Sequence, residues 1–182
     1  LKTEKITLTG ILLLYNNMLQ SLFDSQIKSL GFVMLIIATM FLILFKSIAL
    51  MVIGIVPNLI SALLVLGIMG IMKLPLDMMT ITIAAITVGI AVDNSIHYIY
   101  RFKEELKNCG NYEQTILICH STIGKAIFFT GITVILGFSI LILSNFIPTI
   151  IFGVLTGFAM LVALIAVLTL LPRMLITLKP IK

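Results

Sequence analysis

Charged residues are scarce in this chain, and their scarcity excludes a soluble globular domain. They make up 10% of the 182 residues, against 60% for hydrophobic residues, and the mean hydropathy is +1.25. A soluble domain typically carries about 25% charged residues. The composition therefore predicts an integral membrane protein. Its apolar runs have the length of membrane-spanning helices, so we expect an all-α membrane protein.

The motifs of familiar enzymes are also missing. The sequence has no HExxH, no GxSxG and no glycine-rich phosphate loop. It has no second intramembrane acid that could pair with Asp93 as in an aspartyl protease. Cys109 and Cys119 lack metal-ligand spacing and are expected to be ordinary apolar residues. We expect no enzymatic activity, no cofactor and no metal, and we expect any energy coupling to use an ion gradient.

A leader sequence is not recognisable at the start. The chain begins at Leu1, without a basic segment and a small-residue cleavage site. We therefore expect a piece of a longer polypeptide. Residues 1–29 are predicted to be the end of an extramembrane domain, with a β-like beginning and then an amphipathic lead-in helix.

Apolar runs long enough to cross a bilayer occupy the rest of the chain, the predicted transmembrane bundle of residues 30–182. A polar loop over 101–122 contains Gly110, which should divide it into two short amphipathic pieces. The motifs KLPLD and SNFIP read as tight turns, and Pro57 beside Asn58 predicts a kink. The five predicted spans are about 30–45, 48–72, 80–100, 123–143 and 149–171.

Lysine and arginine are distributed unequally between the two predicted sides of the membrane. The side that holds the 101–122 loop and the C-terminus carries eight of them, and the other side carries four. By the positive-inside rule, the loop and the C-terminus are cytoplasmic. This placement also accounts for the net charge of +5, so we do not expect nucleic acid as a partner.

Asp93 is the most informative residue, because it lies inside the third predicted span. An acid near the centre of a span costs on the order of 3 kcal/mol to insert and is a functional hypothesis by default. Ala85 and Gly89 precede it at four-residue spacing, which favours close packing of another helix and would place Asp93 in a helix interface. The alternative is a structural acid satisfied by a neighbouring helix.

Other polar and small residues of the spans have two interpretations each. Asn94 and His97 could extend a proton path from Asp93. Alternatively, the Asn94 amide could form a hydrogen bond to another helix, and His97 could be a hydrated residue at the membrane interface. Thr130 and Thr133 could face Asp93 or simply bond their own backbone. The GxxxG pair Gly153 and Gly157 predicts helix packing, and His120 is expected on the loop surface.

The segment GIAVDNSIHYIYRFKEE resembles the fourth-helix motif found in each half of resistance-nodulation-division (RND) transporters. The resemblance is greatest to the hydrophobe exporters of the large mycobacterial membrane protein (MMPL) type. It continues through FKSIALMVIGIVPNLISALLVLGIMGIMKLPLDMMTITIAAI before this segment and GKAIFFTGITVILGFSILILSNFIPTIIFGVLTGFAMLVALIAVLTLLP after it.

This resemblance implies one half of a proton-driven exporter of hydrophobic or amphiphilic molecules in the bacterial inner membrane. The five spans would match helices two to six of the six-helix C-terminal half-bundle, with residues 1–29 ending its periplasmic porter domain. Asp93 matches the proton-carrying acid of the motif. The family often has an acid or tyrosine where this chain has Asn94, and an acid in the last helix where it has Val167.

The implied partners are membrane lipids, the transported molecule, protons, the missing N-terminal half of the same chain and further copies of the protein. Two other functions fit the same pattern. One is a lipid-binding or sterol-sensing bundle in which the acid is structural. The other is an auxiliary subunit of protein secretion, although its polar pattern after the acid differs from SIHYIYRF.

Overall fold

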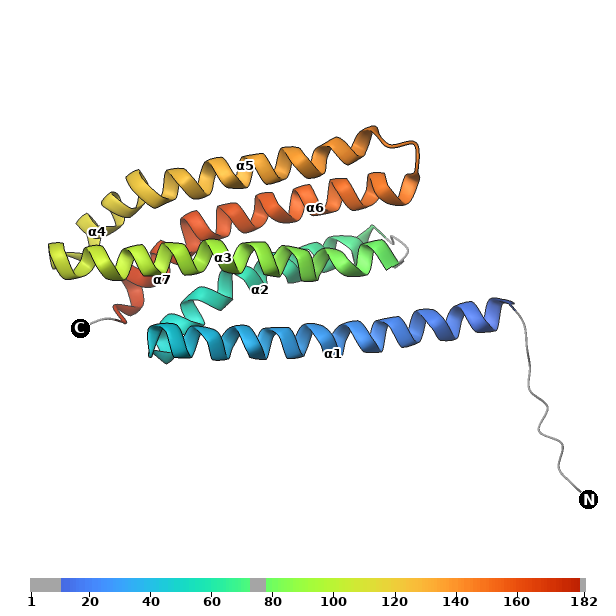
Figure 1. Ribbon diagram of the computed structural model, residues 1–182, viewed down its shortest axis with the longest axis horizontal. Coiled ribbons are helices and arrows are strands. Elements are labelled where there is room, and N and C mark those ends of the chain that lie inside the picture. Colours follow the sequence, from blue (N-terminus) through green and yellow to red (C-terminus); the bar gives the residue numbers. More distant parts are fainter. Residues whose placement is uncertain (1–10, 73–77, 181–182) are drawn as a thin grey trace, which may run out of the picture.

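The computed structural model describes residues 11–72 and 78–180, and within these ranges the chain forms helices and no strands (Figure 1). The long helices run back and forth beside one another, with short π-helical or 3-10 turns at three places. In order, the elements are α1 (Ile11–Phe45), α2 (Ile48–Ile71), α3 (Met78–Cys109), α4 (Tyr112–Cys119), η1 (His120–Gly124), α5 (Lys125–Ser139), η2 (Ile140–Leu143), α6 (Ile147–Ile165), η3 (Ala166–Leu170) and α7 (Leu171–Leu178).

Five helical segments of the described chain are long and apolar enough to cross a membrane, which confirms the predicted all-α membrane fold. They are Ile27–Phe45, Ile48–Ile71, Thr82–Cys109, Tyr112–Leu143 and Ile147–Leu178. Each contains one of the predicted spans or nearly all of it. The KLPLD turn and the β-like beginning within residues 1–10 lie outside the described residues.

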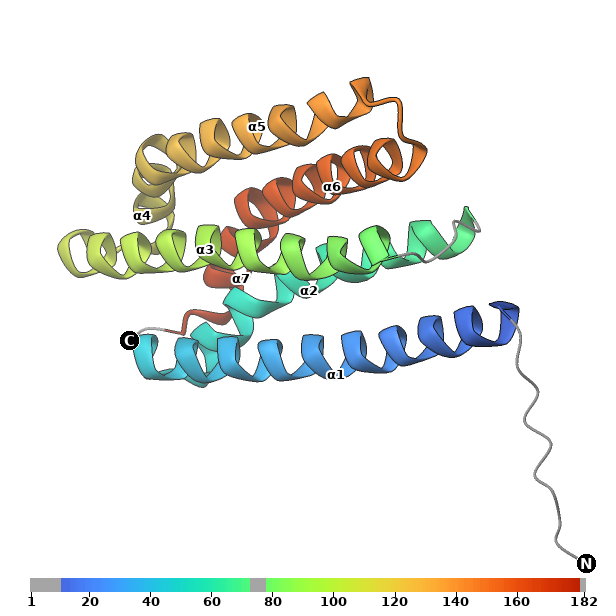
Figure 2. The same ribbon diagram turned by 45° about the vertical axis from the view of Figure 1, so that its right-hand side comes forward.

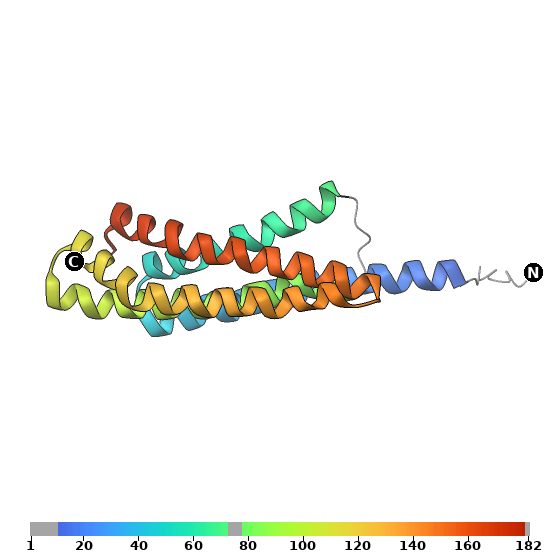
Figure 3. The ribbon, with the colours of Figure 1, turned by 90° about the horizontal axis from the view of Figure 1, so that it is seen from above.

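Helix α1 is continuous through the position where a lead-in helix was expected to give way to the first span. No proline interrupts Ile11–Phe45, and its one glycine, Gly31, costs a helix only about 1 kcal/mol. The 35 residues extend for roughly 52 Å, well beyond a hydrocarbon layer of about 30 Å. Its N-terminal part accordingly projects past the other helices (Figure 3).

The segment expected to be a polar loop is largely helical. Helix α3 continues to Cys109, and Arg101 supports this extension by pairing with Glu104 (Nη1 to Oε2, 3.1 Å) and Glu105 (Nη2 to Oε1, 2.6 Å) one turn later. Gly110 then breaks the helix with a left-handed φ of +66°. The Asn111 side chain caps α4 by accepting a hydrogen bond from the Glu113 amide at 3.0 Å.

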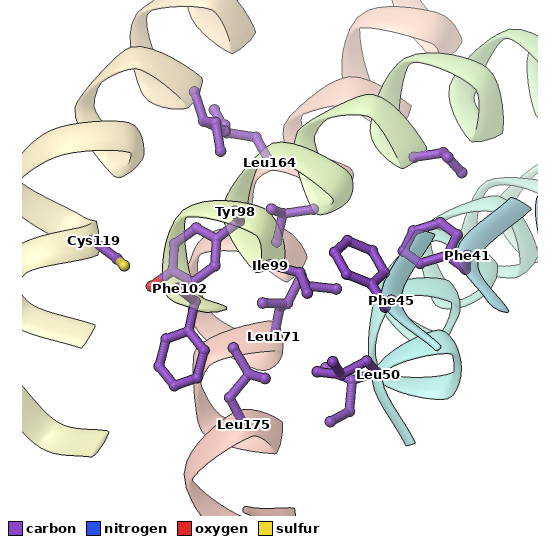
Figure 4. Close-up of a cluster of buried hydrophobic side chains, with 14 of the residues drawn as sticks. Phe41, Phe45, Leu50, Tyr98, Ile99, Phe102, Cys119, Leu164, Leu171 and Leu175 are labelled. Carbon is purple, nitrogen blue, oxygen red and sulfur yellow. The ribbon is translucent and has the colours of Figure 1, made fainter. Parts of the chain in front are cut away.

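Helices α2, α3 and α6 form the centre of the bundle, with α1 and α5 on its outside (Figure 2). In the apolar 18-residue stretches of the three central spans, about half of the residues are buried (44%, 50% and 56%), against 11% and 6% in the corresponding stretches of the spans that contain α1 and α5. These two outer spans expose many large hydrophobic side chains, which suits contact with lipid. Figure 4 shows the main core cluster, which contains Phe41 and Phe45 of α1, Leu50 of α2, Ile99 of α3 and Leu171 of α7.

Candidate functional site

The residues predicted along one side of α3 lie on an exposed stripe of this chain. Ala85, Gly89, Asp93 and His97 are all exposed, and a Cβ built on Gly89 would have no heavy atom within 4 Å. The expected close packing on Ala85 and Gly89 is therefore not made by any helix of the described chain. The four-residue spacing of Ala85 and Gly89 indicates a surface for helix packing. It does not indicate whether the helix that packs there belongs to this chain segment.

Asp93 and His97 pair with each other, because residues four apart face the same way on a helix. The Asp93 Oδ1 lies 3.5 Å from His97 Nε2, and the two side chains are 70% and 61% exposed. A proton on His97 would make this contact an ion pair.

A groove opens beside Asp93 between α3, α5 and α6. Its volume is about 340 Å³, and its lining is apolar except for Asp93, Asn94, His97 and Thr130. The apolar part of the lining includes Ile90 and Ala91 of α3, Ile127 and Val134 of α5, and Met160, Ala163 and Leu164 of α6. The groove brings a carboxylate, an amide, an imidazole and a hydroxyl together next to hydrocarbon.

The two predicted threonines of α5 have different positions. Thr130 lines the groove, although its hydroxyl donates to the carbonyls of Ala126 (3.0 Å) and Ile127 (3.1 Å) of its own helix. Thr133 is exposed, bonds the Phe129 carbonyl at 2.9 Å and does not line the groove. Both hydroxyls therefore bond their own backbone, and Thr130 alone of the pair lies near Asp93's groove.

Glycines determine how closely α5 and α6 approach each other. Gly153 and Gly157 of α6 face the end of α5, where a Cβ on Gly153 would come 2.7 Å from Leu141 Cβ and 2.8 Å from the Phe138 carbonyl oxygen. On α5, a Cβ on Gly131 would come 2.7 Å from Leu164 Cδ1. Gly153 needs glycine because a backbone carbonyl lies against it, whereas the Leu164 side chain that covers Gly131 in the groove lining could move aside.

A buried hydrogen bond links α2 to α3 on the side of α3 away from the stripe. Asn58 and Ser95 are both fully buried, and Asn58 Nδ2 donates to Ser95 Oγ at 3.2 Å and to the Gly54 carbonyl at 2.8 Å. Ser95 is two residues after Asp93, so this bond helps to orient the segment of α3 that carries the acid. The sequence indicated a disturbance at Pro57 and Asn58, but it did not indicate Ser95 as the partner.

His120 is exposed, as expected, but it lies in the π-helical turn η1 and not in a loop, and its ring contacts two other elements near one end of the bundle. Its Nε2 lies 3.1 Å from the Leu168 carbonyl, and its Nδ1 lies 2.8 Å from the hydroxyl of the buried Tyr98. A carbonyl only accepts, so Nε2 carries the hydrogen, and in neutral His120 the Tyr98 hydroxyl donates to Nδ1. His120 therefore joins α3 and η3 through its two ring nitrogens.

This link predicts energetic coupling between His120 and Tyr98. Replacing His120 with alanine leaves the buried Tyr98 hydroxyl without its partner, whereas Tyr98→Phe removes that hydroxyl. We expect His120→Ala to lower the free energy of unfolding less in a Tyr98→Phe background, with a coupling of about 0.5–3 kcal/mol in the double-mutant cycle. Additive effects of the two changes in denaturant unfolding would contradict the assigned hydrogen bond.

Among residues 11–72 and 78–180, no group of three or more histidine, cysteine, aspartate or glutamate side chains is placed to hold a metal ion. Cys119 is buried and Cys109 exposed, and both are free thiols.

Comparison with known proteins places the chain in a known family. The model of the MMPL family matches residues 1–179. The chain is 32% identical over 178 residues to the membrane protein YdgH of Bacillus subtilis, covering 94% of this chain and 20% of that protein. It is 29% identical over 120 residues to the membrane protein MJ1562 of Methanocaldococcus jannaschii, covering 66% of this chain and 31% of that protein. The chain thus spans less than a third of the length of either relative.

Proposed function

The chain belongs to the MMPL family within the RND superfamily, and on this premise we propose that it forms part of a proton-coupled exporter. The exported molecules are hydrophobic or amphiphilic, such as lipids or drugs. The membrane is the bacterial inner membrane, and the C-terminus is cytoplasmic. Asp93 takes up and releases the proton that drives the transport cycle.

The observation that carries the proposal is the position of Asp93 in an otherwise apolar span. Its carboxylate opens onto a groove shared by three helices and lies 3.5 Å from His97 Nε2. The ionised acid favours water or a cation in the groove, whereas the protonated acid tolerates apolar surroundings. Protonation therefore biases the relative positions of α3, α5 and α6, as a transport cycle requires.

The exposed stripe on α3 supports the existence of a second half. Ala85, Gly89, Asp93 and His97 lie in or next to an apolar span, yet no described helix covers them. In lipid, an uncovered acid would be costly, and small residues at this spacing favour a close helix neighbour. We infer that the N-terminal half of the same polypeptide packs on this stripe. We also propose that further copies of the protein assemble with it as a homo-oligomer.

A second candidate function is a lipid-binding or sterol-binding module without proton-driven transport. The mostly apolar lining of the groove favours it, since a hydrocarbon chain would fit there with only four polar side chains nearby. In this alternative Asp93 is structural. The two functions differ in whether a proton gradient does work.

The test uses the full-length protein in proteoliposomes that contain a fluorescent amphiphile and a pH dye. We expect amphiphile movement only when a proton gradient is imposed, accompanied by proton flow in the opposite direction, and we expect both to stop when a protonophore is added. Amphiphile binding that is saturable but unaffected by the gradient, with no movement across the bilayer, would favour the lipid-binding alternative and overturn the proposed antiport.

A further inference from the structure

A second pocket lies where α1 ends and α3 leaves the apolar part of the bundle. It has a volume of about 340 Å³ and is lined by Leu44 and Phe45 of α1 and by Tyr100, Lys103, Glu104 and Lys107 of α3. None of these residues lines the groove beside Asp93. The pocket therefore forms a separate site, with an apolar wall from one helix and a polar wall from the other.

The polar wall carries two ammonium groups without an acidic partner. Lys103 and Lys107 are one turn apart on α3, so they face the same side. The carboxylates of Glu104 and Glu105 pair with Arg101, and within the described chain no carboxylate lies within 4 Å of either lysine. The pocket thus presents uncompensated positive charge to an anion.

The depth of the two lysines suits the phosphate layer of a membrane. Tyr100 is 60% exposed at the end of the apolar run of α3, the position at which aromatic residues mark the membrane interface. Along the helix axis, Lys103 is roughly 4.5 Å and Lys107 roughly 10.5 Å beyond it. The headgroup layer is about 5–7 Å thick on each side, and flexible lysine side chains can reach within it.

The apolar wall continues into lipid-facing surface. Leu44 is 45% exposed, and further along α1 Met40 and Ile36 are 40% and 50% exposed. An occupant that combines an anionic group with a long alkyl chain would contact both walls at once. A soluble anion would use the lysines alone and leave Leu44 unoccupied.

We propose that this pocket binds the headgroup of an anionic phospholipid, with one acyl chain lying along α1 from Leu44. The phosphate contacts Lys103 and Lys107, and the Tyr100 hydroxyl is available as a further donor. Such basic pockets between membrane helices suit phospholipid headgroups, where each lysine near the surface contributes favourable electrostatic energy.

Native mass spectrometry of the full-length protein with added phosphatidylglycerol or phosphatidylcholine tests the proposal. We expect saturable binding of phosphatidylglycerol to the unmodified protein. The double variant Lys103→Gln/Lys107→Gln should weaken this binding about thirtyfold, which is the combined effect of losing two lysines that each contribute the usual electrostatic energy near a membrane surface. The matched control is Lys125→Gln/Lys179→Gln, which removes two lysines that do not line the pocket. This control should leave binding within about twofold of the unmodified protein, since screening weakens distant charges.

Four outcomes would overturn the proposal. Equal weakening by the two double variants would mean that net charge alone attracts the lipid. Equal binding of phosphatidylcholine would mean that the lysines do not select the headgroup. Complete displacement by inorganic phosphate at an equal concentration would mean that the acyl chain contributes nothing. No saturable phosphatidylglycerol binding to the unmodified protein would mean that the pocket is closed in the full-length molecule.

Discussion

Asp93→Asn is expected to abolish proton-coupled transport by the full-length protein while leaving its membrane insertion and folding intact. Asparagine has nearly the shape of aspartate and keeps its hydrogen-bonding capacity, but it cannot take up or release a proton. Because the Asp93 side chain is 70% exposed and makes one polar contact, to His97, its replacement leaves no buried partner unsatisfied within the described chain. Transport of a fluorescent amphiphile under an imposed pH gradient measures the effect.

Two further variants make this result specific. Asp93→Glu keeps the ionisable group and should retain part of the activity, because the longer side chain still opens onto the groove. Asp24→Asn removes an exposed acid from the projecting part of α1 and should leave transport unchanged. Undiminished gradient-driven transport by Asp93→Asn would remove Asp93 from the mechanism, and equal losses in both asparagine variants would point to a general charge effect.

Gly153→Ala is expected to lower the free energy of unfolding by about 1–3 kcal/mol, the usual cost of overpacking a close contact. The added Cβ would come 2.7 Å from Leu141 Cβ and 2.8 Å from the Phe138 carbonyl oxygen. The carbonyl belongs to the backbone, so it cannot move without shifting the end of α5. Thermal or denaturant unfolding of the purified protein measures the loss.

Gly157→Ala is the matched control, since it lies one turn along the same helix. Its added Cβ would lie 3.6 Å from Ser139 Oγ and 3.8 Å from the Ile135 carbonyl oxygen, which are ordinary contact distances. Alanine also favours a helix over glycine by about 1 kcal/mol. We expect Gly157→Ala to be neutral or stabilising, and equal destabilisation by both variants would show that the α5–α6 contact is not the cause.

Most of the fold could be predicted from the sequence because hydropathy decides which segments enter a membrane. The apolar runs are long, the charges lie between them, and each run needs its own backbone hydrogen bonds in lipid. The helical state of residues 101–109 and the continuity of α1 were harder to predict. Polar residues such as Lys103 and Glu104 are compatible with either a loop or a helix, and Arg101's contacts with the following turn favour the helix.

The candidate site could be predicted only in part. Asp93 is identifiable because an acid in an apolar run is unusual, and His97 follows it at helical spacing. The groove residues of α6, such as Met160 and Leu164, carry no chemical signal of their own, and the partners of His120 are the Tyr98 hydroxyl and the Leu168 carbonyl. Contacts of this kind join segments far apart in the chain, which no local pattern specifies.

The sequence by itself determined the membrane class of this protein, its helices and the presence of an acid inside an apolar span. Those properties depend on composition and on spacing along one helix. Only the tertiary structure decided that Asp93 opens onto a groove, that Thr133 lies outside it, and that Lys103 and Lys107 flank a pocket with the end of α1. The physical reason is that helix packing sets which faces meet, and packing depends on side-chain shape at many distant contacts together.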